Sequence, residues 1–384
     1  MSAGQTTEGR QEQGQTLRAL HIFSGNLYGG VERSLLTLYL CRSECPEMTL
    51  HFGYCFEGRL SQELRDIGAP LFYLGSPRAR WPLSIWRARR RLQSVLTEHH
   101  FDCVITNSPW AQAIFGPPIR RAGIRNVLRQ HDLPEGKHWT ERWAQLHPPD
   151  RVLCNSQFTL GVMQKLYSGV PADFLYPPVP NGCESFAAAA RGATRRALDL
   201  SPEATVLIQI GRMEPVKGHS LMLKALSLLR DVPGWICLIV GGIQRDHEAL
   251  YMQSLKDKAR DWGISERVGF LGQRRDIFEL LAASDVFVQG NVGPETFGIV
   301  FIEALYAGLP VVTTDLGGAR EILSGDYGVL VPTGDPQVLA EALRKLIEDP
   351  ALRSKYRSSG PARADELCNP SQQTRRFYEL LVQS

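Results

Sequence analysis

The sequence lacks the cysteine spacings of a zinc ribbon or of a small disulfide scaffold. Its eight cysteines are scattered from Cys41 to Cys368. This pattern predicts free thiols in a reducing compartment. Cys41, Cys103, Cys154 and Cys237 lie within apolar runs, so we expect their side chains to be buried as small hydrophobic groups.

Long apolar runs and an excess of one charge are also lacking. No uninterrupted apolar run approaches the roughly 20 residues that a membrane span requires. Residues 1–16 are polar and have no apolar core, which predicts a disordered lead rather than a signal peptide. Lys and Arg number 43 against 40 Asp and Glu, so no bulk field would recruit nucleic acid. We expect a cytoplasmic protein with no nucleic-acid partner.

From Leu20 onwards, short apolar runs alternate with helical patterns, which is typical of βαβ units. Strands are predicted at residues 20–23, 50–52, 70–73, 103–106, 126–128 and 151–154, and again at 206–210, 235–240, 268–271, 286–288, 311–313 and 329–331. Continuous apolar strands suit parallel sheets covered on both faces. The pattern predicts an α/β fold of two facing, doubly wound, Rossmann-like domains with ligands in the cleft between them.

The proline-rich segment at residues 176–182 leaves little room for a helix or a central strand, so we expect the interdomain linker there. The predicted organisation is a lead at 1–16, an N-terminal domain at 17–178, a C-terminal domain at 179–365, and a final segment at 366–384. A surface helix is expected at 187–198. The last helix, near residues 372–382, has no strand after it and could cross back to the first domain.

Two loops that follow predicted strands carry groups suited to an anion. Gly29 and Gly30 precede a helix, where backbone amides can approach a phosphate, although a tight turn is the commoner use of such glycines. Arg212 and Lys217 stand five residues apart on a glycine-bracketed segment and can bend towards one diphosphate. Two solvated surface cations are the alternative interpretation.

Residues 294–310 are the most informative stretch. Glu295 ends a loop, and Glu303 lies inside an apolar helix whose start near Gly298 offers unpaired amides. An acid among so many core-type residues usually needs a polar partner. Phosphate-binding amides together with acids that accept hydrogen bonds from hydroxyls match the chemistry of a nucleotide sugar.

The Glu-x7-Glu pair Glu295 and Glu303, the Gly-Arg-x4-Lys-Gly run at residues 211–218, the Gly29-Gly30 loop and the Gly-Gly-Ala-Arg-Glu run at 317–321 resemble glycosyltransferase family 4, the glycosyl transferases of group 1. The resemblance covers nearly the whole chain from about Leu17. It implies the GT-B fold and retaining transfer of a sugar from a nucleotide donor to an acceptor hydroxyl, by front-face departure and attack.

The resemblance also implies roles for the matching residues. Arg212 and Lys217 would neutralise the donor diphosphate, Glu303 would hold the ribose hydroxyls, and Glu295 those of the transferred sugar. The nucleotide base would rest against the backbone near residues 272–274. The donor-binding residues expected on this basis are Gly29, Gly30, Arg212, Lys217, Gly272, Gln273, Glu295, Phe297, Gly298, Ile299 and Glu303.

His131 matches a histidine that the family places beside the donor sugar, and a surface or capping role is its alternative. The predicted catalytic set is His131, Glu295, Arg212 and Lys217. Acceptor recognition is expected of Asn26, Tyr28 and Asn107. Many family members have Pro-Ser before the first glutamate, whereas this chain has a longer, glycine-rich approach at residues 289–293.

The chain contains no Asp-x-Asp, the usual carboxylate cradle for a donor-bound metal, so we expect neither a metal nor a cofactor. Residues 82–96 form a basic amphipathic pattern with tryptophans nearby. This pattern fits a peripheral contact with the inner face of a membrane, or a helix that merely covers the first sheet. The oligomeric state is left open.

Three alternatives remain open. A nucleotide-sugar epimerase would need no acceptor, and a binding protein would keep an idle donor site. A sugar-phosphate synthase would need extra cations on the first domain, for which the candidates are Arg120, Arg121, Arg125 and Arg129.

Overall fold

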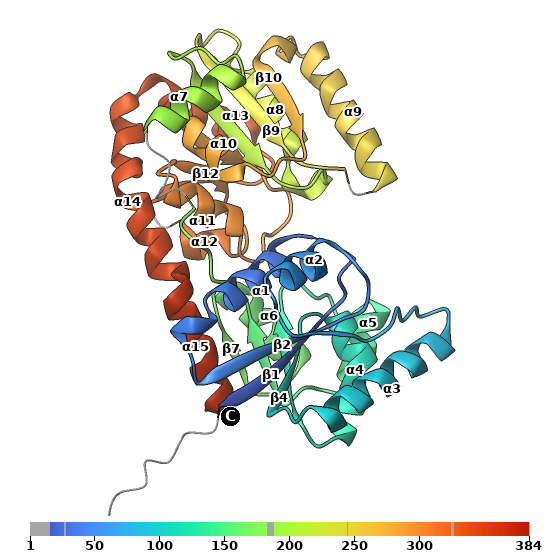
Figure 1. Ribbon diagram of the computed structural model, residues 1–384. Helices are drawn as coiled ribbons and strands as arrows, with labels where there is room; N and C mark the ends of the chain where they lie inside the picture. Colours follow the sequence, from blue (N-terminus) through green and yellow to red (C-terminus); the bar gives the residue numbers. More distant parts are fainter. Residues whose placement is uncertain (1–15, 27, 183–187, 244, 324–325, 384) are drawn as a thin grey trace, which may run out of the picture.

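Two wholly parallel sheets, each with its own helices, organise the molecule (Figure 1). The computed structural model describes residues 16–26, 28–182, 188–243, 245–323 and 326–383. The predicted lead therefore lies outside the described residues except for residue 16, as does residue 187 of the predicted surface helix. The expected fold class, two doubly wound α/β domains, is confirmed.

The first sheet has seven strands in the order β3-β2-β1-β4-β5-β6-β7. They are β1 (Leu17–Phe23), β2 (Met48–Tyr54), β3 (Leu71–Tyr73), β4 (Cys103–Thr106), β5 (Arg125–Gln130), β6 (Arg151–Cys154) and β7 (Ala172–Phe174). The first six were predicted. The strand β7 was not predicted, because this half-buried edge strand is three residues long and carries Asp173 at its centre, so it forms no apolar run.

The second sheet has six strands in the order β10-β9-β8-β11-β12-β13, all of them predicted. They are β8 (Thr205–Ile210), β9 (Trp235–Val240), β10 (Val268–Gly272), β11 (Val286–Gln289), β12 (Val311–Thr314) and β13 (Gly328–Val331). In both sheets the chain starts in the middle, proceeds to one edge and then crosses to the other side. The resulting switch points lie between β1 and β4 and between β8 and β11, where open sheets bind ligands.

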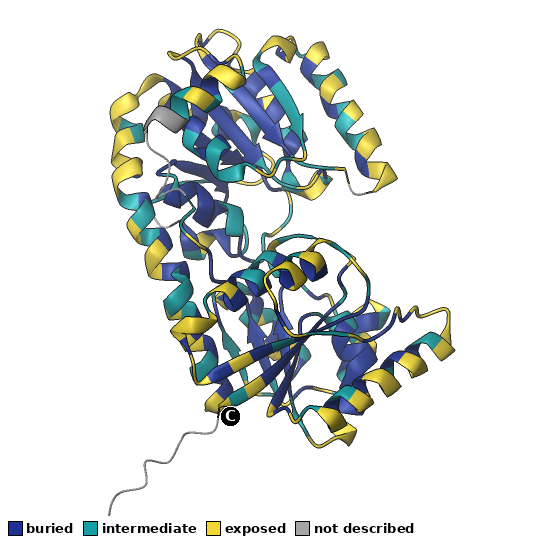
Figure 2. Ribbon diagram, viewed as in Figure 1, coloured by how far each residue is buried: buried dark blue, intermediate teal, exposed yellow. Residues whose placement is uncertain are grey.

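Helices bury both faces of the first sheet (Figure 2). On one face lie α1 (Gly30–Leu40), α2 (Arg59–Asp66) and the C-terminal α15 (Pro370–Val382). On the other lie α3 (Pro82–Glu98) and α4 (Pro109–Arg121), with α5 (Trp139–Leu146) packed beside α4. The helix α6 (Gln157–Leu166) packs on β6 and β7. As expected, Cys103, Cys154 and Cys237 are buried, whereas Cys41 is only partly buried.

The second sheet is covered in the same way. One face carries α8 (His219–Ser227), α9 (Asp246–Asp261) and α13 (Pro336–Glu348). The other carries α10 (Ile277–Ala283), α11 (Ile299–Tyr306), α12 (Ala319–Ile322) and α14 (Pro350–Cys368), while α7 (Ala188–Ala197) packs on α10.

The chain passes between the domains twice, and the two passages touch. The first lies between β7 and α7. The second is the junction of α14 with α15 (Figure 1). Beyond this junction, α15 buries Phe377, Leu380 and Leu381 in the core of the first domain. The backbone amide of Val179 in the first passage donates to the carbonyl of Cys368 in the second, at 3.0 Å. The two covalent connections between the domains therefore lie side by side.

Candidate active site

A cavity of about 800 Å³ lies between the domains. Its walls come from loops at the carboxyl ends of β1, β4 and β5 in the first domain and of β8, β10 and β11 in the second. The predicted site residues that line it are Asn26, Tyr28, Gly29, Gly30, Asn107, His131, Arg212, Lys217, Gln273, Glu295, Phe297, Gly298, Ile299 and Glu303. Gly272 is not among the lining residues; it ends β10, and its carbonyl accepts a hydrogen bond from Gly241 at 3.0 Å.

Lys217 and Glu295 form the centre of the second-domain wall. The Lys217 ammonium donates to Glu295 Oε2 at 2.6 Å, and both side chains are largely buried. Gly218 follows with a positive φ of 68°, and a Cβ there would lie 1.6 Å from the carbonyl oxygen of Gly290. Only glycine permits this backbone approach, which fixes the loop of Lys217 against the segment that leads to Glu295.

The glycine-rich segment at residues 289–293 contacts the loop of Lys217. The backbone amide of Val292 donates to the carbonyl of Val216 at 3.0 Å, and the side-chain amide of Gln289 donates to Glu295 Oε2 at 3.4 Å. Behind Glu295, its carbonyl accepts from the amide of Gly318 at 2.8 Å. The departure from the family pattern therefore holds the first glutamate from a second side.

The start of α11 presents backbone amides to the cavity. Gly298 precedes the helix with φ 103°, and no side chain caps the helix start. A Cβ at Gly298 would lie 2.5 Å from the ring of Phe301. Phe297 is buried and stacks on Tyr176 with 5.1 Å between ring centres, which anchors the turn. Uncapped amides and the helix dipole together favour an anion at this point.

Glu303 projects from α11 and is 1% exposed. Its partner is Arg33, which lies on α1 in the opposite domain and lines the same cavity. The sequence indicated that Glu303 needs a polar partner but did not identify it. The only signal was the position of Arg33 in the first turn of the helix that follows the Gly29-Gly30 loop.

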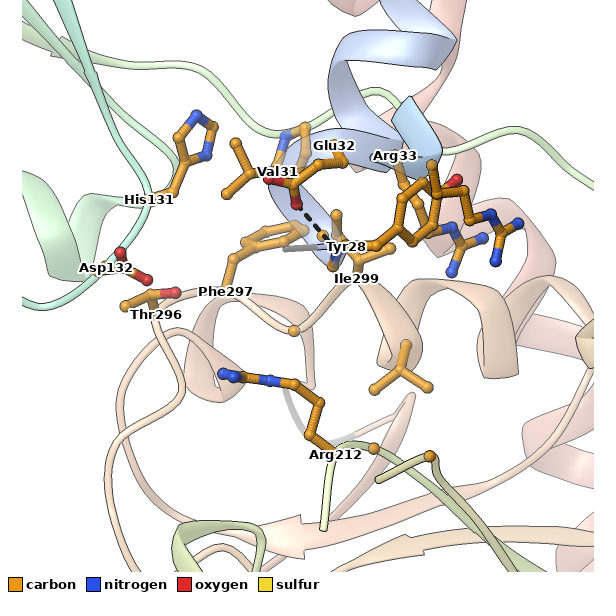
Figure 3. Close-up of a pocket in the computed structure, with 18 of the residues that line it drawn as sticks. Tyr28, Val31, Glu32, Arg33, His131, Asp132, Arg212, Thr296, Phe297 and Ile299 are labelled. Carbon is orange, nitrogen blue, oxygen red and sulfur yellow. Dashed lines mark hydrogen bonds between the residues drawn. The ribbon is translucent and has the colours of Figure 1, made fainter. Parts of the chain in front are cut away.

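Arg212 extends into the cleft from the second domain and faces Glu32, His131 and Asp132 of the first (Figure 3). Its guanidinium pairs with Glu214 at 2.7 Å, and its side chain remains 43% exposed. Burial raises the pKa of Glu32, and Arg212 across the cleft opposes that shift. Asp132 is exposed to the cavity, yet the surrounding protein restricts its hydration and raises its pKa, again opposed by Arg212.

His131 follows β5 and is 9% exposed. Burial, and then the positive charge of Arg129, lower its pKa well below 6.5, so the imidazole is neutral at neutral pH. Its carbonyl accepts from the side-chain amide of Asn155 at 3.1 Å, and the same amide donates to Thr296 in the second domain at 3.2 Å. Asn155 was not predicted as a site residue.

The N-terminal wall of the cavity mixes aromatic and cationic groups. The hydroxyl of Tyr28 donates to Glu63 at 2.7 Å, and the guanidinium of Arg59 lies 4.0 Å from the centre of its ring. The side-chain nitrogen of Asn107 donates to the carbonyl of Ile22 at 3.1 Å. Arg78 is exposed, and no ion pair holds it within the described part of the chain.

The four arginines that the synthase alternative relied on do not line this cavity. Arg129 is buried beneath it at 3% exposure, and Arg120 and Arg125 border a separate cavity at the amino end of β5. The first-domain arginines that line the cavity are Arg33, Arg59 and Arg78. Among the residues described, no three His, Cys, Asp or Glu side chains gather as a metal-ligand set.

Glu321 joins the domains beside the cavity. Its carboxylate accepts from the amides of Gln157 at 2.9 Å and Phe158 at 2.7 Å, which begin α6. It also accepts from the hydroxyl of Tyr176 at 3.0 Å. The Gly-Gly-Ala-Arg-Glu run therefore supports Glu295 through its glycines and contacts the first domain through its glutamate.

Two family models match the chain, one in each domain. The model described as Glycosyltransferase Family 4 matches residues 28–180, and the model described as Glycosyl transferases group 1 matches residues 191–363. Together they cover most of both domains.

Two bacterial relatives are similar in sequence. The GDP-mannose-dependent monoacylated alpha-(1-6)-phosphatidylinositol monomannoside mannosyltransferase of Corynebacterium glutamicum is 30% identical, over 74% of this chain and 78% of that protein. The phosphatidyl-myo-inositol mannosyltransferase of Mycobacterium leprae is 37% identical over 47% of each chain, so this chain spans about half the length of that relative.

The fold is also similar to crystal structures of Anabaena HepE in complex with UDP and with UDP-glucose. Their TM-scores are 0.85 and 0.84 at 22% identity, and the match covers 96% of this chain and 100% of that one. At this identity the likeness establishes the architecture, two facing Rossmann-like domains with a cleft between them.

Proposed function

Because the chain belongs to glycosyltransferase family 4, we propose that it transfers a sugar from a nucleotide-sugar donor to an acceptor hydroxyl, retaining the anomeric configuration and using no metal ion. One observation carries the proposal: Lys217, Glu295 and the uncapped start of α11 converge on a single interdomain cavity. This arrangement matches the chemistry of a sugar attached to a diphosphate.

The reaction separates charge, because the sugar ring becomes positive while the leaving diphosphate becomes more negative. Lys217, Arg212 and the amides of α11 would stabilise the negative charge that develops on the leaving group. Stabilisation of developing charge is usually the largest single contribution to catalysis. Glu295 would accept hydrogen bonds from the hydroxyls of the transferred sugar. His131 is neutral at neutral pH, so it would place no positive charge beside the developing cation.

We further propose that the acceptor carries a phosphate group. Arg59 and Arg78 line the N-terminal wall, and a guanidinium is well suited to a phosphate. The two relatives are named as mannosyltransferases of phosphatidylinositol compounds, which carry a phosphate. The phosphate would lie against these arginines while the accepting hydroxyl enters the cleft.

The third part of the proposal is a peripheral contact with an anionic membrane. Residues 67–97 contain six arginines and neither Asp nor Glu. The apolar face of α3 is buried in the first domain, yet Trp81, Leu83 and Trp86 are 63%, 70% and 52% exposed. In the residues described, no helix combines the length and apolar character needed to cross a membrane.

The test is transfer by the purified protein. Candidate nucleotide sugars are incubated with and without phosphorylated polyol acceptors, and the anomeric configuration of the product is read by NMR. Lys217→Ala should lower turnover at saturating donor about 100-fold, as losses of charge-stabilising groups commonly do. Lys355→Ala, which removes an exposed cation from the pair with Asp326, should leave turnover unchanged.

Each part of the proposal can fail separately. An isomerised sugar formed from donor alone would favour an epimerase. Loss of activity on chelation, with recovery by manganese, would contradict the metal-free account. Equal turnover for phosphorylated and unphosphorylated acceptors would remove the role of Arg59 and Arg78.

A further inference from the structure

Glu303 is a buried carboxylate whose counter-charge comes from the other domain. It projects from α11 among Val300, Phe301 and Ile302, and it pairs with Arg33 on α1. Burying an ionised carboxylate is costly unless a cation pairs with it. The pair with Arg33 offsets that cost, and it exists only while the two domains meet.

The contact between α1 and α11 is close along their first turns. A Cβ at Gly30 would lie 3.1 Å from Cδ1 of Ile299, so the start of α1 sits directly on the start of α11. Arg33 and Glu303 lie one turn further along their helices. Arg33 is 33% exposed and lines the cavity, so its guanidinium borders both the carboxylate and the space for a ligand.

The ion pair leaves part of the carboxylate available. Arg33 contacts Oε1 of Glu303, and Oε2 can accept further hydrogen bonds. The two hydroxyls of a ribose are donors that such an oxygen can bind. A carboxylate held in the right orientation can accept a hydrogen bond from each of them.

We propose that Arg33 is a positioning residue that completes the ribose subsite from the first domain, by pairing with Glu303 and holding its carboxylate oriented towards the ribose hydroxyls. The inference rests on the proposed function and on the expectation from the family resemblance that Glu303 holds the ribose hydroxyls. It adds that the nucleotide site is composite: binding of the donor depends on the acceptor domain being in contact with α11.

The experiment compares nucleotides with and without ribose hydroxyls. Binding of UDP and GDP is measured by calorimetry, and the tighter of the two is compared with its 2′,3′-dideoxy form. The wild type should prefer the ribonucleotide. Arg33→Gln should lower the affinity for the ribonucleotide about tenfold, because the ribose hydroxyls lose a charge-assisted hydrogen bond to an oriented Glu303. The affinity for the dideoxy form should stay nearly unchanged.

Arg65→Gln is the matched control, because Arg65 on α2 forms an exposed pair with Glu57; its ribose preference should equal that of the wild type. If the wild type shows no ribose preference, the role expected of Glu303 from the family resemblance fails. If the wild type prefers ribose and Arg33→Gln does so equally, the role of Arg33 is overturned and the proposed function stands. Should Arg33→Gln not fold, Arg33→Lys decides, because lysine lacks the planar fork: a reduced preference supports the inference and an unchanged one overturns it.

Discussion

At the scale of single residues, three buried histidines make the stability of the protein depend on pH. Burial lowers the pKa of His21 to about 3 and that of His219 to about 4, and it lowers the pKa of His131 well below 6.5. An unfolded histidine takes up a proton near pH 6.5, whereas these native imidazoles do not. Stability is therefore full above pH 6.5 and is lost as the pH falls below it, until the folded-state values are reached.

The expected loss at pH 5.5 relative to pH 7.5 is about 1.4 kcal/mol for each histidine. Denaturant unfolding at the two pH values measures it. His219→Gln should reduce the total difference by about 1.4 kcal/mol, because it removes one histidine whose native pKa is lowered to about 4. Glu32, whose pKa is raised by burial, acts in the opposite direction at lower pH. A free energy of unfolding that does not change between these pH values would contradict the account.

The same scale shows what the sequence could and could not predict of the site. Lys217 and Glu295 follow strands that end at the same edge of one sheet, so topology alone predicts that they meet. Arg33 and Asn155 contact residues of the other domain, and no spacing within the chain encodes how two domains face each other. Their catalytic and binding roles, like those of every site residue named here, remain predictions.

At the scale of elements, the predicted strands are all present because buried parallel strands are continuous apolar runs. Several strands were predicted too short, because polar residues at their ends, such as Arg125 at the start of β5, continue the pairing with the neighbouring strand. The edge strand β7 was missed for the opposite reason, since it has no apolar run to detect. Residues 289–293 are unusual in the sequence, but their contact with the loop of Lys217 joins segments far apart in the chain, which no local pattern encodes.

Glu321 supports a prediction at this scale, because it accepts hydrogen bonds from the first two amides of α6. A carboxylate at a helix start satisfies free amides and complements the helix dipole. Glu321→Ala should lower the free energy of unfolding by about 1–2 kcal/mol. Denaturant unfolding measures the loss, and scattering should report a larger radius of gyration, since the contact joins two domains.

The matched control is Glu366→Gln on α14. Glu366 is exposed and pairs with Arg363 within the same helix, so its loss should change neither the stability nor the dimensions of the protein. A Glu321 variant that is as compact and as stable as the Glu366 variant would show that the contact does not hold the domains together.

At the scale of the whole molecule, the two domains touch through polar contacts rather than through a shared apolar core. Ser156 donates to the carbonyl of Thr296 at 2.6 Å, beside the contacts of Asn155, Arg33 and Glu321. The hydrophobic clusters stay within one domain or the other, apart from α15 and the linker. Polar contacts can be exchanged for hydrogen bonds to water. An interface of this kind is expected between domains that move relative to each other.

The exposed side of α3 gives the molecule a surface suited to an anionic bilayer (Figure 2). Trp81, Leu83 and Trp86 would enter the headgroup region while neighbouring arginines bind phosphates, and Arg90 already lies 4.5 Å from the Trp86 ring. The protein should float with anionic liposomes at low salt and less so at high salt. Replacing the three apolar residues with alanine should abolish flotation without unfolding the domain, because their side chains are exposed.

Charge and apolar area make separable contributions to that binding. Changing Arg87, Arg90 and Arg91 to Gln should weaken it more than tenfold, at about 1 kcal/mol for each arginine near an anionic surface, and should remove most of the salt dependence. Leu250→Ala on α9, 74% exposed in the other domain, is the control and should float like the wild type. If the wild type stays in solution with anionic vesicles, or if Leu250→Ala lowers flotation as much as the α3 variants, then α3 serves only to cover the first sheet. Binding that survives in the arginine variant at high salt would instead assign the contact to the tryptophans and the leucine.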